Sequence, residues 1–163
     1  MTPSRLIVDV PDLAGTNAFG RRLAGLLFPG AVVALVGPLG AGKTHLVRAV
    51  ALGLGIVDNR VVSSPTFVLI QEYAARIPIY HFDAYRLQDS ADFADLGAHE
   101  YFEGNGVSFV EWADRVAGYL PADYLRVTLA ITGETSRRLT AESFGQRYTD
   151  VVRQLALEGD SRE

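Results

Sequence analysis

An apolar run that leads directly into a glycine-rich loop constrains this chain more than any other feature. Residues 31–36 read Ala-Val-Val-Ala-Leu-Val, and residues 37–44 read Gly-Pro-Leu-Gly-Ala-Gly-Lys-Thr. The loop has the pattern G-x-x-x-x-G-K-[ST] between a strand pattern and a helix pattern, which is the setting of a phosphate-binding loop. Glycines let backbone N–H groups surround an anion, and the helix start adds its positive dipole end. A glycine-rich turn without a ligand is the alternative interpretation.

Within this loop, side chains and backbone have separate predicted roles. We expect Lys43 to reach the β- and γ-phosphates of a nucleotide and Thr44 to bind both the nucleotide and Mg²⁺. Lys43 is the only lysine in the chain, and a compact ammonium suits a crowded phosphate site. The backbone that would surround the phosphates belongs to Gly37, Leu39, Gly40, Ala41 and Gly42.

The remaining sequence alternates strand and helix patterns. We expect strands at residues 5–10, 31–36, 67–70, 77–82, 107–110, 125–131 and 138–142. Helices are expected from Asp12 or Thr16 to before Pro29, after the loop to residue 54, before Leu120, and over residues 144–157. The pattern predicts a three-layer α/β fold of the P-loop NTPase type, with a mostly parallel sheet and an antiparallel hairpin insertion at residues 67–82. Residues 1–158 would form one domain and residues 159–163 a frayed tail.

Charge and composition narrow the class of protein. The chain has 163 residues, 48% hydrophobic content, no cysteine and a formal net charge of −4. Without a basic surface, direct capture of nucleic acid is disfavoured, so we expect a nucleic-acid role to come through partners. An uncharged stretch at residues 23–42 is broken by Pro29 and Pro38, which favours a buried strand over a membrane span. We expect a soluble, cytoplasmic protein.

Two carboxylates qualify as partners of the loop. Asp83 and Glu111 each end an apolar strand pattern, and open α/β sheets bind ligands at the carboxyl ends of their strands. We assign Glu111 to Mg²⁺, through water, and Asp83 to orienting the attacking water or completing the metal shell; Lys43 completes the catalytic set. An ordinary strand-end acid is the alternative for Glu111. Thr66, at residues 64–66, would meet Mg²⁺ or the γ-phosphate in a switch segment, or belong to a plain turn.

Other polar and aromatic residues permit less specific predictions. Residues 83–103 contain six acidic residues and one arginine, which indicates a solvated helical face or a docking surface for a basic partner. Trp112, the only tryptophan, is expected to pack next to the site and to report nucleotide binding. We interpret the three histidines as structural.

Four motifs in order resemble the TsaE family, also called YjeE. They are Leu-Gly-Ala-Gly-Lys-Thr at 39–44, Ser-Pro-Thr-Phe at 64–67, His-Phe-Asp-Ala-Tyr-Arg-Leu at 81–87, and Glu-Trp at 111–112. Thr16 and Gly20 precede them, and the match covers most of residues 12–120. Pro38 stands where the family usually has Asp, and Ala113 where it usually has Pro; neither change removes a ligand.

The resemblance implies a Mg²⁺-dependent ATPase, weak alone and coupled to partners, in the threonylcarbamoylation of adenosine 37 of tRNA. It implies a complex with homologues of TsaB and TsaD, through which tRNA is contacted only indirectly. The resemblance assigns phosphate and Mg²⁺ to Lys43 and Thr44, the Mg²⁺-side acid to Glu111, and support of hydrolysis to Asp83. Trp112 would lie beside the nucleotide, and Thr16 and Arg137 match nucleotide-binding positions loosely.

ATP is favoured over GTP because the Asn-Lys-x-Asp motif that reads guanine is absent: Lys43 is the only lysine. Two alternatives remain open. One is a small-molecule kinase with the same loop, which needs an acceptor pocket and a lid. The other is a nucleotide-dependent assembly factor whose turnover is incidental.

Overall fold

The computed structural model describes residues 4–56, 70–85, 87, 89 and 91–160. The segment with Ser64, Pro65 and Thr66 lies outside the described residues, so the expectation for it is not tested. In chain order the strands are β1 (Arg5–Val10), β2 (Val32–Val36), β3 (Ile70–Tyr73), β4 (Ile79–Asp83), β5 (Val107–Glu111), β6 (Tyr124–Ile131) and β7 (Arg137–Phe144). The helices are α1 (Leu13–Ala24), α2 (Lys43–Gly53), α3 (Ala91–Asp95), α4 (Ala98–Phe102), the 3₁₀ helix η2 (Ala113–Tyr119) and α5 (Gln146–Asp160).

One seven-stranded sheet organises the described part of the chain, in the order β1-β7-β6-β2-β5-β4-β3. β2 pairs in parallel with β5 and β6, and β5 pairs in parallel with β4. β3 pairs antiparallel with β4, which confirms the predicted hairpin, but its first strand is Ile70–Tyr73 instead of residues 67–70, of which 67–69 lie outside the described residues. β7 pairs antiparallel with both β6 and β1. The sheet is therefore parallel in the middle and antiparallel at both edges, and the predicted α/β class is confirmed.

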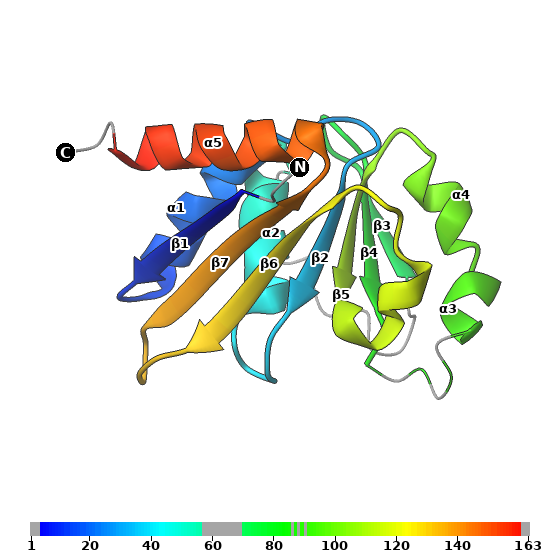
Figure 1. The fold of residues 1–163 in the computed structure, drawn as a ribbon, viewed down its shortest axis with the longest axis horizontal. Coiled ribbons are helices and arrows are strands. Elements are labelled where there is room, and N and C mark those ends of the chain that lie inside the picture. Colours follow the sequence, from blue (N-terminus) through cyan, green and yellow to red (C-terminus); the bar gives the residue numbers. More distant parts are fainter. Residues whose placement is uncertain (1–3, 57–69, 86, 88, 90, 161–163) are drawn as a thin grey trace.

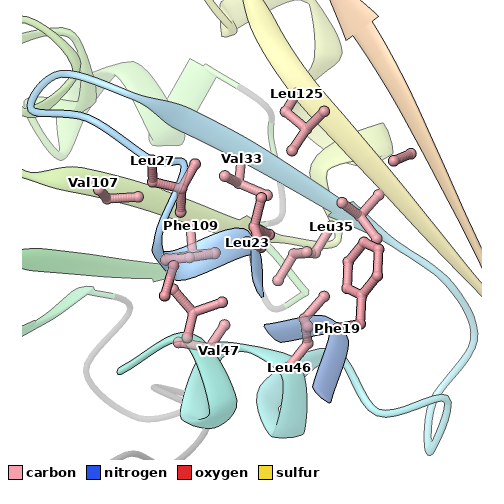
Figure 2. Close-up of a cluster of buried hydrophobic side chains, with 14 of the residues drawn as sticks. Phe19, Leu23, Leu27, Val33, Leu35, Leu46, Val47, Val107, Phe109 and Leu125 are labelled. Atoms are coloured by element: carbon pink, nitrogen blue, oxygen red, sulfur yellow. The ribbon is translucent and has the colours of Figure 1, made fainter. Parts of the chain in front are cut away.

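Helices cover the two faces of this sheet, which gives the expected three layers. The larger core lies between the sheet and α1, α2 and α5. Figure 2 shows how this core is filled by side chains from α1, α2, β2, β5, β6 and the segment that follows α1: Phe19, Leu23, Leu27, Val33, Leu35, Leu46, Val47, Val107, Phe109 and Leu125. A smaller core lies under α3, α4 and η2, where Phe82 of β4 and Val110 of β5 meet Phe93. Figure 1 shows α3 and α4 at the β3–β4 side of the molecule and α5 near β1 and β7.

β2 has this central position because its alternating side chains are apolar on both faces. Val33 and Leu35 face the larger core, and Ala34 faces the smaller one. All three are almost fully buried. A strand covered on both faces is expected to be apolar throughout. The loop that follows β2 is thereby held at the middle of the carboxyl edge of the sheet.

One of the two predicted caps of the first helix is confirmed, and several element boundaries differ from the predicted ones for local reasons. Asp12 caps α1, because its side chain accepts a hydrogen bond from the Gly15 N–H; Thr16 lies inside the helix. The segment before Leu120 is a 3₁₀ helix rather than an α-helix. β7 includes Phe144, and α5 begins only at Gln146, after Gly145 turns the chain with a φ of 105°. Within the described residues, no helix is long and apolar enough to cross a membrane.

The acidic segment forms two short helices. Asp92 and Asp95 on α3 and Glu100 on α4 are exposed to solvent, while Phe93 is buried against the sheet. The exposure of these acids fits a solvated helical face and a docking surface for a basic partner equally, so both stay predictions for residues 83–103.

Candidate functional site

The glycine-rich loop turns between β2 and α2 in the conformation that its glycines permit. Gly40 and Gly42 have φ angles of 81° and 107°, a region that residues with a Cβ atom rarely occupy. A Cβ atom on Gly37 would lie 2.5 Å from the backbone oxygen of Leu129 on β6. Gly42 is the N-cap of α2 and makes no side-chain cap hydrogen bond. The amides at the start of α2 are therefore available to an anion.

Lys43 is folded back over the loop rather than extended from it. Its Nζ donates hydrogen bonds to the carbonyl oxygens of Gly37 (2.6 Å) and Pro38 (3.0 Å). The same ammonium lies 3.9 Å from the centroid of the Trp112 ring, within the range of a cation–π interaction. Burial lowers the pKa of Lys43, and the negative charges of Glu111, Asp114 and Asp83 act in the opposite direction. A triphosphate would replace the loop carbonyls as the partner of this ammonium.

The two predicted acids lie side by side at the carboxyl edge of the sheet. Asp83 ends β4, Glu111 ends β5, and the two residues are direct partners in the parallel register. Both are buried, at 4% and 3% exposure. The Oγ1 of Thr44 donates a hydrogen bond of 2.8 Å to Oε2 of Glu111. Asp83 Oδ1 accepts a hydrogen bond of 2.8 Å from the backbone N–H of Tyr85.

The loop, Lys43, Thr44, the two acids and Trp112 line one cavity of about 530 Å³. Of the predicted site residues, it is lined by Leu39, Gly40, Gly42, Lys43, Thr44, Asp83, Glu111 and Trp112. His45, Arg48 and Tyr85 also line it and were not predicted. Burial, and next the positive charge of Arg48, lower the pKa of His45.

A second cavity of about 460 Å³ adjoins the first along the loop. Both cavities are lined by Gly40, Gly42 and His45. Thr16 and Arg137, the two loosely matched positions, line the second cavity together with Ala41. Arg137 Nε donates to the carbonyl oxygen of Ala41 at 3.3 Å. Arg137 therefore contacts the backbone of the loop from β7.

Trp112 takes an unusual backbone conformation beside the acids. Its φ of 59° is the one positive φ of a non-glycine residue in the described part of the chain. Such a conformation costs about 1–2 kcal/mol for an L-residue and is found where a site requires it. The centroid of the Trp112 ring lies 4.8 Å from that of the Tyr85 ring, and the Lys43 ammonium lies over the face of the Trp112 ring. The residue after Glu111 thus forms one wall of the cavity.

His81 is a buried residue next to Glu111 that the sequence interpretation did not assign to the site. Its Nε2 lies 2.5 Å from Glu111 Oε2, and its Nδ1 lies 3.2 Å from the hydroxyl of Tyr73. We expected His81 to be structural, but it touches the acid assigned to Mg²⁺. The spacing His-x-Asp in β4 was the available signal, because residues two apart on a strand point to the same face.

Phosphate, Mg²⁺ and the residues present fit one another. A loop with free helix-terminal amides, a lysine, and a threonine hydrogen-bonded to a strand-end carboxylate form the donor set that a Mg²⁺–nucleotide requires. The fold and this site define a P-loop protein of the α/β class.

Comparisons with known proteins specify the family. The model of the family "Threonylcarbamoyl adenosine biosynthesis protein TsaE" matches residues 10–139. A protein of Bacillus subtilis named tRNA threonylcarbamoyladenosine biosynthesis protein TsaE is 41% identical over 142 residues, which cover 86% of this chain and 87% of that protein. A protein of the same name from Treponema pallidum is 42% identical over 125 residues, which cover 77% and 91% of the two chains.

A solved structure agrees with the sequence comparisons. The crystal structure of Bacillus subtilis YdiB superposes with a TM-score of 0.84 at 33% sequence identity, over 98% of this chain and 99% of that one. The chain belongs to the TsaE family, as its motifs predicted.

Proposed function

We propose that this protein binds and hydrolyses ATP as a component of the machinery that forms N6-threonylcarbamoyladenosine at position 37 of tRNA. It acts there in a complex with homologues of TsaB and TsaD and meets tRNA only through that complex. The observation that carries the ATPase proposal is the hydrogen bond between Thr44 Oγ1 and Glu111 Oε2. It joins the last residue of the phosphate loop to a strand-end acid, as a site for a Mg²⁺–nucleotide requires.

The loop and α2 hold the triphosphate in this proposal. The N–H groups at the start of α2 and the Lys43 ammonium bind the β- and γ-phosphates. Lys43 must leave the carbonyl oxygens of Gly37 and Pro38 to do so. The cavity of about 530 Å³ beside the loop receives the terminal phosphates. The neighbouring cavity, lined by Thr16 and Arg137, receives the adenosine.

The acids divide the chemistry between them. Thr44 and Glu111 would hold Mg²⁺, Glu111 through a water molecule. When bound, Mg²⁺ neutralises charge on the phosphate oxygens. Asp83 accepts a hydrogen bond from the attacking water and orients it toward the γ-phosphorus. A bond forms between that water oxygen and phosphorus, one water proton passes to a γ-phosphate oxygen, the bond to the β–γ bridging oxygen breaks, and ADP and inorganic phosphate leave. Trp112 and Tyr85 cover one side of the cavity and limit the access of other water.

The charge of the chain supports an indirect role at tRNA. The formal net charge is −4, and binding to a nucleic acid requires a concentration of basic side chains. The TsaB and TsaD homologues would therefore supply the surface that holds tRNA. A cytoplasmic location follows from this proposed role.

Phosphate release, measured for the protein alone and with purified TsaB and TsaD homologues, tests the proposal. We expect slow release alone, faster release in the complex, and strong loss of release in Asp83→Asn and Glu111→Gln. The matched control is Asp150→Asn, because Asp150 is an exposed acid of α5 and lies outside the acidic segment of residues 83–103. A small-molecule kinase would instead phosphorylate a free metabolite rapidly without partners. An assembly factor would form the complex equally well with both acid variants.

A further inference from the structure

The β3–β4 hairpin sends two buried side chains toward Glu111. His81 on β4 is fully buried, and Tyr73 on β3 is 8% exposed. The Tyr73 hydroxyl donates a hydrogen bond of 2.5 Å to Oε1 of Gln71 and lies 3.2 Å from Nδ1 of His81. Gln71 and His81 are direct partners in the antiparallel register. Gln71, Tyr73, His81 and Glu111 thus form a chain of polar contacts from the sheet edge to β5.

The contact between His81 and Glu111 restricts the orientation of the Glu111 carboxylate. His81 Nε2 lies 2.5 Å from Glu111 Oε2. Thr44 Oγ1 donates a hydrogen bond to the same carboxylate oxygen. Two hydrogen-bond partners on different elements leave the Glu111 side chain little rotational freedom.

We propose that His81 is a positioning residue, which holds the Glu111 carboxylate in the orientation that Mg²⁺–nucleotide binding needs, and that Tyr73 holds the His81 ring in turn. This inference rests on the proposed function. Without His81, a glutamate with three rotatable bonds would have to become ordered when Mg²⁺–nucleotide binds, and that ordering weakens binding. Removing a partner that orients a metal ligand typically lowers metal affinity about 10–100-fold.

The chemistry of the side chains offers a matched pair of variants. The amide nitrogen of glutamine can replace imidazole Nε2, so His81→Gln keeps a donor toward Glu111. The amide of asparagine is one bond shorter and replaces Nδ1, so His81→Asn keeps a partner for Tyr73 and loses the contact with Glu111. Tyr73→Phe is a milder third variant, which keeps the ring in the core and removes only the hydroxyl.

The experiment measures binding of a non-hydrolysable ATP analogue by calorimetry at a series of MgCl₂ concentrations and in EDTA. We expect the Mg²⁺ concentration for half-maximal binding to rise at least about 10-fold in His81→Asn, to change less than about 3-fold in His81→Gln, and to rise by an intermediate factor in Tyr73→Phe. Affinity in EDTA should be the same in all four proteins, because the phosphate loop is unchanged. Thermal unfolding in EDTA identifies any variant that does not fold.

The outcomes separate this inference from the proposed function. If the parent protein binds no nucleotide at any Mg²⁺ concentration, the proposed function fails. If the parent binds it and the folded His81→Asn and Tyr73→Phe proteins have the Mg²⁺ dependence of the parent, only the positioning role is overturned. Equal weakening in His81→Asn and His81→Gln would also overturn it, because the contact with Glu111 would then not be the cause. If His81→Asn does not fold, the Tyr73→Phe result decides.

Discussion

The hydrogen bond between Thr44 and Glu111 should affect both stability and Mg²⁺ binding, and Thr44→Val tests both. Valine has nearly the shape of threonine, so the substitution removes the hydroxyl and little else. Glu111 is 3% exposed, and its carboxylate would lose the hydrogen bond from Thr44 while His81 remains at 2.5 Å. The loss of a hydrogen bond to a charged group costs about 1.5–3 kcal/mol, and we expect the lower part of this range because the contact with His81 persists.

A loss of about 1.5–2 kcal/mol corresponds to a Tm about 3–8 °C lower for a domain of this size. The assays are thermal unfolding in EDTA and calorimetric titration of an ATP analogue with and without Mg²⁺. We expect Thr44→Val to bind the analogue in EDTA as the parent does, and to gain little from added Mg²⁺. Thr44→Ser, which retains a hydroxyl, is the control and should resemble the parent. An unchanged Tm together with an unchanged Mg²⁺ response in Thr44→Val would refute this reasoning.

Three other predictions concern the loop, the core and the tryptophan. Gly37→Ala should abolish nucleotide binding in calorimetry, because its Cβ would lie 2.5 Å from a β6 carbonyl oxygen. Gly97 has a φ of 81°, and a Cβ atom there would meet nothing within 4 Å, so Gly97→Ala should only lower the Tm and bind nucleotide normally. Tyr148→Phe should lower the free energy of unfolding in urea by about 1–3 kcal/mol, because the Val32 N–H donates to the Tyr148 hydroxyl at 2.9 Å; an unchanged value contradicts this. Nucleotide binding should change the fluorescence emission of Trp112, because the phosphates would draw the Lys43 ammonium away from its position 3.9 Å from the ring centroid. Unchanged emission throughout a nucleotide titration would show that Lys43 does not lie against Trp112 in solution.

The parts of the site that local sequence encodes could be predicted. The loop follows from its own glycines and from the apolar strand before it, and Lys43 and Thr44 follow from the loop. Asp83 and Glu111 could be placed together because parallel strands bring their carboxyl ends to one edge. The register then makes these two acids direct neighbours.

The contacts that depend on strand register could not be predicted in the same way. His81 meets Glu111 only because β4 pairs in parallel with β5, and it meets Tyr73 only because β3 pairs antiparallel with β4. Neither register is visible in a single strand. The left-handed conformation of Trp112 was equally hidden, because tryptophan has no preference for it. Trp112 in this conformation is also the N-cap of η2.

Calorimetric titration of the protein with ATP and Mg²⁺ tests the central claim most directly. The parent should bind ATP at one site. Lys43→Ala should lose at least about 100-fold in affinity, because charge-assisted hydrogen bonds to two phosphates, about 1.5–3 kcal/mol each, disappear. Arg153→Ala, at an exposed position of α5, should bind as the parent does. Equal affinity for ATP in the parent and in Lys43→Ala would contradict the claim that this loop holds the triphosphate.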